Sequence, residues 1–232
     1  MGESFDLVIR GGTVIDGGNR PRFRADVGVR DGRIAAIGDL GGGSGREEVE
    51  ADGLIVAPGF IDSHTHDDQA LFVAPEMMPK VSQGVTTVVT GNCGISSAPV
   101  PAWRPLPPPF NLLDLGEGQG FSSFAGYFRA LAASPASVNV VGLVGRGSLR
   151  LAAMGEDLAR AATDKEIAVM RELLRESLEA GAAGLSSGLV YPPAAAAPTA
   201  ELIEIGRPLA EFGGIYVTHM RNEEDRIFDA LD

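Results

Sequence analysis

Short apolar runs broken by polar residues fill the first 57 residues, and this pattern is typical of β-strands. Asp31-Gly32 lies between two such runs, where Asp-Gly is a strong signal for a hairpin. We expect another turn at Gly11-Gly12 and a glycine-rich loop over residues 40–45. Residues 1–57 are therefore predicted to form a small β domain. Its expected strands cover residues 7–10, 13–15, 25–29, 33–37 and 55–57.

From Pro58 onward, short apolar strands alternate with longer helical segments. In residues 164–180 the apolar residues recur at helical spacing, and Thr163 is placed to cap the first turn. Repeated β-then-α units predict parallel strands covered by helices, as in a (β/α) barrel or a doubly wound sheet. About five units are too few to close a barrel of eight strands. The expected strands cover residues 59–63, 86–90, 138–144, 183–187 and 215–218, and the expected helices cover residues 76–83, 121–132, 164–180 and 199–212.

Two loop segments differ in composition from the rest of the chain. The proline-rich stretch 98–110 is interpreted as a stiff connector. The glycine-rich segment 116–120 follows no strand and carries an acidic residue, so it is a poor candidate for a phosphate-binding loop.

All three histidines and the single cysteine fall at the ends of predicted strands. His64 and His66 end the strand over 59–63, Cys93 lies just past the next strand, and His219 ends the last one. Because the carboxyl ends of parallel strands meet at one edge of a sheet, side chains far apart in sequence can share one ion there. Imidazole nitrogen and thiolate sulfur are ligands that suit zinc.

Other uses of these residues remain open. A nucleophilic Cys93 activated by His219 is one alternative, but it leaves His64 and His66 without a role. A lone histidine or cysteine is also often a plain structural residue. The adjacent acids Asp67 and Asp68 are candidates to orient an imidazole.

Composition narrows the class of protein. Nineteen Lys and Arg against 31 Asp and Glu give a net charge of −12, which disfavours nucleic-acid binding in the absence of a basic stripe. The sequence contains neither an apolar run near the roughly 20 residues of a membrane helix nor the pattern of a signal peptide at its start. One cysteine cannot form an internal disulfide, so we expect a cytoplasmic protein with no nucleic-acid or membrane partner.

At these residues the sequence resembles the amidohydrolase superfamily, and within it the N-acyl-D-amino-acid deacylase branch. The PGFID-H-x-H motif is specific for the superfamily, and the GNCG, GLS-x-GL-x-Y and THMRNE motifs are specific for the branch. The matching segments are residues 7–17 (LVIRGGTVIDG), 57–68 (APGFIDSHTHDD), 84–94 (GVTTVVTGNCG), 184–192 (GLSSGLVYP) and 216–223 (YVTHMRNE).

The resemblance implies an α/β fold: a distorted TIM barrel, here partial with about five βα units over residues 58–232, and a small, partial β-sandwich over residues 1–57. This branch uses a cysteine on the second barrel strand as a zinc ligand, where other relatives use a carboxylated lysine. The only lysines here, Lys80 and Lys165, lie in predicted helices, which argues against the hydantoinase-like branches.

The resemblance also implies the activity, zinc-dependent hydrolysis of the N-acyl bond of N-acyl-D-amino acids with one or two zinc ions. Cys93 and His219 would hold the tighter ion, and His64 and His66 would lie near a second, weaker one. Tyr191 and Arg221 are the expected contacts of the substrate carboxylate. Another amidohydrolase reaction, on a cyclic amide or imide, stays open.

Family members are about twice as long as this chain. Their sixth-strand histidine and catalytic aspartate would lie beyond residue 232, so no catalytic residue is assigned here. The chain is therefore expected to be the N-terminal half of such an enzyme, with a complementary C-terminal half as partner or with no activity of its own. Two departures lie near the expected substrate mouth: Arg146 replaces a usual histidine, and Pro193 follows Tyr191-Pro192 where a glycine is usual.

Overall fold

The computed structural model describes residues 4–101, 106–113 and 120–231. The chain divides into two compact units, residues 1–59 and residues 60–232. The division falls two residues beyond the end of the predicted β domain.

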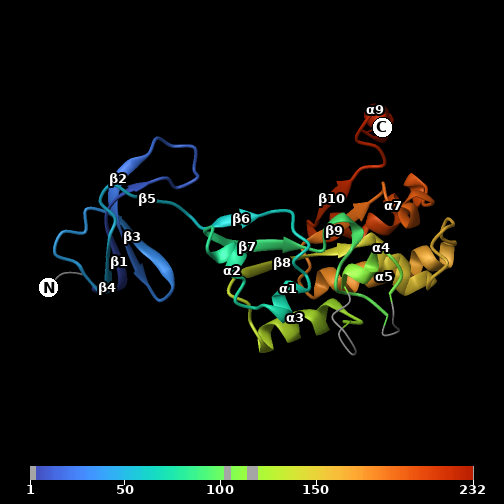
Figure 1. Cartoon of the computed structure of the whole chain (residues 1–232), viewed down its shortest axis with the longest axis horizontal. Coiled ribbons are helices and arrows are strands. Elements are labelled where there is room, and N and C mark those ends of the chain that lie inside the picture. The colour runs from blue at the N-terminus through green and yellow to red at the C-terminus, as the bar shows by residue number, and fades with distance from the viewer. Residues whose placement is uncertain (1–3, 102–105, 114–119, 232) are drawn as a thin grey trace. The chain divides into compact units, whose positions relative to one another are not determined.

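The N-terminal unit is one five-stranded sheet (Figure 1). β1 lies between β2, which pairs with it antiparallel, and β4, which pairs with it parallel. The hairpin predicted at Asp31-Gly32 joins β2 to β3, with both residues at positive φ as a two-residue turn requires. The strands are β1 (Ser4–Val14), β2 (Phe23–Arg30), β3 (Arg33–Gly38), β4 (Ser44–Glu50) and β5 (Ile55–Val56).

Two predictions for this unit were wrong. Gly11-Gly12 is not a turn, because β1 runs through it with a shift of register between Ile9 and Gly12. Gly11 has a φ of +63° and its N–H donates to Asp26 Oδ1 at 2.7 Å, so the glycines form a bulge. β4 was not predicted, because its SGREEVE sequence is polar and its side chains are largely exposed at a sheet edge.

The second unit is built on five parallel strands in the order β10-β9-β8-β7-β6, which curl into part of a barrel (Figure 1). Every predicted strand of this region is confirmed, with ends that differ by no more than one residue. Neighbouring strands in the sheet are also neighbours in the chain, as repeated βα units require. The strands are β6 (Phe60–Asp62), β7 (Val85–Thr90), β8 (Asn139–Gly145), β9 (Gly184–Gly188) and β10 (Ile215–His219).

The helices agree less well with prediction. Helix α4 was not predicted, because Arg146 begins it directly after β8 with no intervening loop. The helix expected over 199–212 is divided just before Pro208, and the one expected over 76–83 is a single turn. The α-helices are α1 (Ala70–Val73), α2 (Met78–Val81), α3 (Phe124–Ala133), α4 (Arg146–Met154), α5 (Asp164–Glu179), α6 (Pro192–Ala195), α7 (Thr199–Gly206), α8 (Pro208–Phe212) and α9 (Ile227–Leu231).

The main core lies between the curled sheet and the helices beside it. Val88, Val144 and Leu185 of the strands and Met170 and Leu174 of α5 are fully buried in one cluster. This packing fixes the strands, and with them the loops at their carboxyl ends. Among the described residues, the structure contains no helix that is both long and apolar enough to cross a membrane.

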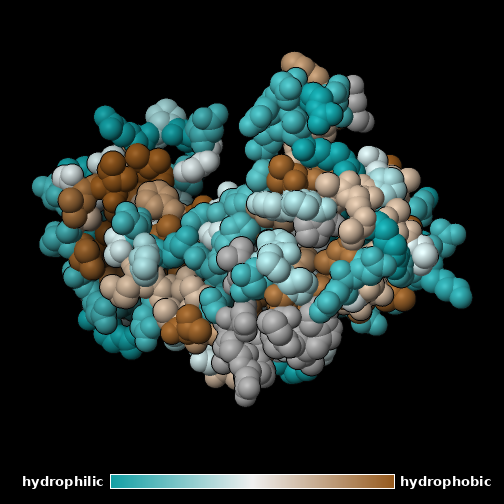
Figure 2. Space-filling model, turned by 45° about the vertical axis from the view of Figure 1, so that its right-hand side comes forward, coloured by the Kyte–Doolittle hydropathy of each residue, from teal (hydrophilic) through white to brown (hydrophobic). Residues whose placement is uncertain are grey.

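Large apolar side chains remain exposed on both units (Figure 2). In the second unit the sheet ends at β6 and β10. Phe60 and Ile61 of β6 are 62% and 66% exposed, and Ile215 of β10 is 51% exposed. Central parallel strands are normally buried on both faces. These two strands therefore form open edges within the described part of the chain.

The proline-rich stretch 98–110 and the glycine-rich segment 116–120 fall partly outside the described residues. Residues 102–105 of the proline-rich stretch and 116–119 of the glycine-rich segment are not described. Within the proline-rich stretch, Val100, Leu106 and Phe110 are buried in a small cluster with Leu151 of α4. This part therefore packs against α4 within the second unit.

Candidate metal centre

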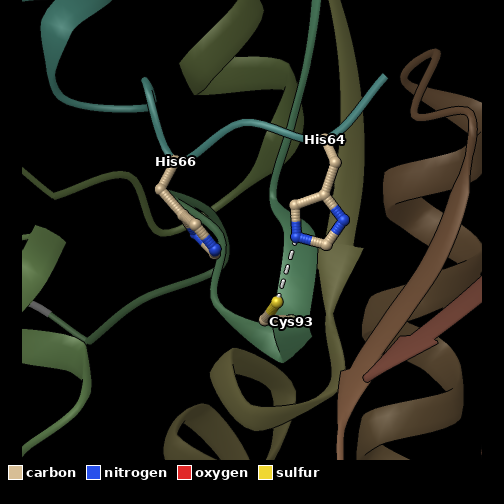
Figure 3. A group of neighbouring side chains, drawn as sticks. All are labelled: His64, His66 and Cys93. Carbon is tan, nitrogen blue, oxygen red and sulfur yellow. Dashed lines mark hydrogen bonds between the residues drawn. The ribbon is translucent and has the colours of Figure 1, made fainter. Parts of the chain in front are cut away.

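Two loops bring three of the predicted ligands together. His64 and His66 extend from the loop after β6, and Cys93 lies in a short 3-10 turn, Asn92–Gly94, that follows β7 (Figure 3). The ligand atoms of the three side chains all lie within 4.8 Å of one another. The two-residue spacing of the histidines thus directs both rings to the same side, as the sequence predicts.

The donor set fits a zinc ion in chemistry and in spacing. His64 Nε2 lies 3.2 Å from Cys93 Sγ. Zinc bonds of about 2.3 Å to sulfur and about 2.0–2.1 Å to nitrogen place such a pair about 3.6 Å apart in a tetrahedral site. His219 Nδ1 lies 3.9 Å from the same sulfur. The distances from Cys93 Sγ to the ring nitrogens of His64 and His219 therefore lie just below and just above the sulfur–nitrogen separation expected in a zinc site.

His219 is held by two further side chains. It ends β10, and Tyr191 Oη lies 3.3 Å from its Nδ1 with the two rings edge to face. Its other nitrogen, Nε2, lies 3.5 Å from Glu223 Oε2. A carboxylate at Nε2 favours a proton on that nitrogen and leaves Nδ1 free, facing Cys93. The role of Glu223 was not predicted. Glu223 follows His219 by four residues in an irregular segment, where spacing along the chain does not indicate which side chains meet.

The backbone around Cys93 is unusually constrained. Gly91, Cys93 and Gly94 all have φ values between +54° and +78°, which is uncommon for a side chain such as cysteine. A Cβ atom at Gly91 would lie 2.0 Å from Leu143 O of β8, so only glycine fits there. Close packing of this turn on β8 fixes where the thiol points.

Hydrogen bonds also join the two ligand-bearing loops to each other. Asn92 Nδ2 donates to Thr65 O at 3.3 Å and to Val89 O at 2.9 Å. Thr65 lies between the two histidines, and its hydroxyl donates to Val89 O as well. The histidine pair and the cysteine are thus held in one frame by β7.

Burial favours the uncharged forms of the ligands. Burial raises the pKa of the Cys93 thiol, and the largest opposing cause is its hydrogen bond with Tyr191. Burial, followed by the nearby His64, lowers the pKa of His66. His66 can therefore offer a lone pair, and the Cys93 thiol has a proton to release on binding a cation.

The acids after His66 do not serve as predicted. Asp67 pairs instead with Lys80 of α2, with 2.9 Å between Oδ2 and Nζ. Asp68 is buried and accepts the N–H of Gly91 at 3.2 Å. Burial raises the pKa of Asp68 to about 6. Both carboxylates therefore brace the loop, in one case against α2 and in the other against the cysteine turn.

The two lysines lie in helices, as expected. Lys80 is in α2 and Lys165 is in the first turn of α5. Neither lysine therefore extends from the carboxyl end of a barrel strand beside the group formed by His64, His66 and Cys93.

Of the two predicted substrate contacts, Tyr191 contacts His219, and Arg221 bonds to a backbone carbonyl. Arg221 Nη2 donates to Ala197 O at 2.8 Å. Tyr191 also lines a pocket, and the other walls of this pocket include Cys93, Ile95, Phe110, Arg150 and Leu158. The pocket is apolar on most sides, and Cys93 is part of its wall.

A buried charge cluster beneath this pocket was not predicted. Arg146, at the position where the family usually has histidine, is fully buried, as is Arg150. Both pair with the buried Glu201 of α7, which also accepts the N–H of Ala162 at 2.9 Å. Arg146 is therefore part of the frame under the pocket, and burial lowers its pKa to about 10.

Comparisons with known proteins agree with this geometry. A D-aminoacylase from Alcaligenes xylosoxydans xylosoxydans is 56% identical over 230 residues, which are 99% of this chain and 47% of that protein. A solved D-aminoacylase structure matches with a TM-score of 0.94 and 53% identity over 98% of this chain and 48% of that one. The structure of N-acyl-D-glutamate deacylase from Bordetella bronchiseptica, solved with zinc and a phosphonate inhibitor, matches with a TM-score of 0.91 and 48% sequence identity. That match covers 99% of this chain and 48% of the deacylase.

This chain spans about half the length of those relatives. The model of the amidohydrolase family matches residues 47–230, which include the three histidines and the cysteine. The curled sheet of parallel strands and the ligand-bearing loops at its carboxyl edge accord with that match. The chain belongs to the amidohydrolase family.

Proposed function

We propose that this chain is the zinc-binding half of an enzyme that hydrolyses the N-acyl bond of N-acyl-D-amino acids. The observation that supports it is the group His64, His66 and Cys93, with His219 beside it, at the carboxyl edge of a half-barrel. The relatives named as deacylases of D-amino acids support the substrate class. A cysteine just past the second barrel strand, in place of a strand-end lysine, supports this branch over the cyclic-amide hydrolases.

Cys93 and His219 are proposed to hold the tighter zinc ion, and His64 and His66 to lie at a second, weaker one. A bound zinc ion would polarise the amide carbonyl and lower the pKa of a water molecule toward about 7. The protein's own part is to keep the sulfur and the ring nitrogens in place. The frame that Asn92 and Thr65 build between the two loops serves that purpose.

Tyr191 is proposed to contact the substrate. Its hydroxyl lies beside His219, and its side chain lines the apolar pocket together with Cys93. Arg221 is proposed as a second contact, for the substrate carboxylate. Its guanidinium donates one hydrogen bond to Ala197 O, and a guanidinium has further N–H groups that can donate to a carboxylate.

The partner is proposed to be a complementary C-terminal half. The open edges at β6 and β10 suit further parallel strands, since barrels abolish such edges. The N-terminal sheet is likewise proposed to be one layer of a β-sandwich, because Ile34, Leu54 and Ile55 expose more than half of their surface. A cytoplasmic location is proposed because Cys93 must stay reduced to bind a metal.

Amine release from N-acetyl-D-amino acids tests the function. The chain is assayed with zinc, alone and after co-expression with the C-terminal half of the Alcaligenes D-aminoacylase. We expect hydrolysis of the D-substrate by the pair, little hydrolysis of the L-enantiomer, and none by the chain alone. General acid–base catalysis supplied by the missing half is worth about 10²–10⁴-fold.

Three outcomes would contradict the proposal. A soluble, zinc-loaded pair that releases no amine would exclude the deacylase activity. Faster hydrolysis of hydantoin or another cyclic amide would favour the alternative reaction. Robust turnover by the chain alone would show that a complementary half is not required.

A further inference from the structure

Lys80 pairs with two carboxylates that bracket the histidine pair. Its Nζ lies 2.7 Å from Asp62 Oδ2 and 2.9 Å from Asp67 Oδ2. Asp62 comes two residues before His64, and Asp67 directly follows His66. All three charged side chains are more than half withdrawn from solvent, with exposures of 22%, 34% and 23% for Lys80, Asp62 and Asp67. One ammonium group thus closes the loop that holds both rings.

Lys80 contacts the histidine loop from a different segment of the chain. It lies on α2, and residues 82–84 connect α2 directly to β7, the strand that leads to Cys93. Asp62 also accepts the N–H of His64 at 3.4 Å. The ion pair therefore ties the backbone that holds His64 to the segment that leads to the cysteine.

The charges explain why a cation is needed there. Two partly buried carboxylates that approach one ammonium group would repel each other if it were absent. Without Lys80, desolvated carboxylates beside the histidines would favour a more open loop.

We propose that Lys80 is a positioning residue for the histidine pair, holding His64 and His66 at ligand distance from Cys93 through Asp62 and Asp67. The proposal rests on the proposed zinc site. Lys80 contacts no ligand atom, so its effect is on how well the site is formed before a metal arrives. Residues that orient metal ligands in this way typically contribute about 10–100-fold to metal affinity.

The test measures zinc affinity by competition with a chromophoric chelator, using the wild-type chain, Lys80→Met, Lys80→Arg and Lys165→Met. Lys165 is the only other lysine and is exposed on α5, so Lys165→Met removes the same charge away from the site. We expect Lys80→Met to weaken binding by about 10-fold. Lys80→Arg should recover most of that loss, and Lys165→Met should match the wild type.

Two further readouts separate positioning from general stability. The visible spectrum of the Co²⁺-substituted chain should change in Lys80→Met but not in Lys165→Met, since it reports ligand geometry. Thermal unfolding of the metal-free variants shows how far each is folded. Should Lys80→Met fold poorly, Asp62→Asn preserves side-chain volume and removes the first anchor, and it should weaken zinc binding to a similar extent.

The possible results are distinct. Equal zinc affinity and equal Co²⁺ spectra for Lys80→Met and Lys165→Met would overturn the positioning role, even if Lys80→Met melts earlier. Failure of Lys80→Arg to recover binding would overturn the charge-based explanation. A wild-type chain that binds no zinc would instead refute the proposed function, and this inference with it.

Discussion

At the scale of single residues, the buried carboxylate of Glu201 carries the largest expected effect on stability. It is paired with the buried guanidinium groups of Arg146 and Arg150. Removing one partner of a buried ion pair typically costs about 3–5 kcal/mol, because the remaining charge is left uncompensated. Glu201→Gln should therefore lower the free energy of unfolding by about this amount, as measured by urea denaturation followed by circular dichroism.

Glu204→Gln is the matched control on the same helix. Glu204 pairs with Arg207 and Arg171 at the surface, where ion pairs are worth about 0–1 kcal/mol. Equal losses for the two variants would show that the buried cluster contributes no more than a surface pair.

Asp26 predicts a pH effect in the N-terminal unit. Its carboxylate accepts the N–H of Gly11 and pairs with Arg10, and these contacts lower its pKa below the usual 3.8. The folded pKa is below the unfolded one, so this stabilisation is present above about pH 4 and is lost as the pH falls through the folded value. Asp26→Asn should destabilise the unit at about pH 7 and make less difference at about pH 2.

Thermal unfolding of the wild type and Asp26→Asn at both pH values measures this difference. Asp39→Asn serves as a control, because Asp39 is a nearby acid in a loop of the same unit. A gap between the wild type and Asp26→Asn that is as wide at low pH as at neutral pH would contradict the assignment.

At the scale of elements, the first turn of α5 offers a local test. Thr163 Oγ1 accepts the N–H of Glu166, and the Glu166 carboxylate accepts the N–H of Thr163, which together form a capping box. Thr163→Ala should cost about 1 kcal/mol. Thr199→Ala, at an exposed start of α7 with no side-chain cap, should be nearly neutral by the same denaturation measurement. Equal effects would show that the box is not a stabilising cap.

Strands were easier to predict than helices for physical reasons. Most of the barrel strands are short runs rich in valine, isoleucine and threonine, bounded by glycine or polar residues, so their composition marks them in the sequence. α4 begins at Arg146 with no cap or loop to announce it, and β4 is a polar edge strand whose residues resemble a loop. Local signals fail where tertiary packing, rather than the segment's own residues, decides the structure.

The same contrast holds for the site. His64, His66, Cys93 and His219 could be grouped from sequence because topology brings strand ends together. The roles of Lys80 and Glu201 could not, since each depends on charges from distant segments. In the sequence alone, a single charged residue is interpreted as solvent-exposed, because its partner is known only from the fold.

At the scale of the whole molecule, the open edges predict association. Ile61 on β6 and Ile215 on β10 are more than half exposed where a closed barrel would bury them. The chain should bind a hydrophobic dye and self-associate at moderate concentration. Co-expression with the complementary half should suppress both effects, measured by dye fluorescence and by size-exclusion chromatography. A monomeric chain that does not increase the fluorescence of the dye would show that these edges need no partner to cover them.

The central claim is that a single thiolate and neighbouring imidazoles bind zinc, and zinc-edge X-ray absorption of the chain loaded with one equivalent tests it most directly. We expect one sulfur neighbour at about 2.3 Å with nitrogen neighbours at about 2.0–2.1 Å. We also expect loss of the sulfur shell in Cys93→Ser, together with most of the bound metal. A wild-type spectrum with no sulfur neighbour, or one that Cys93→Ser leaves unchanged, would contradict zinc binding by Cys93.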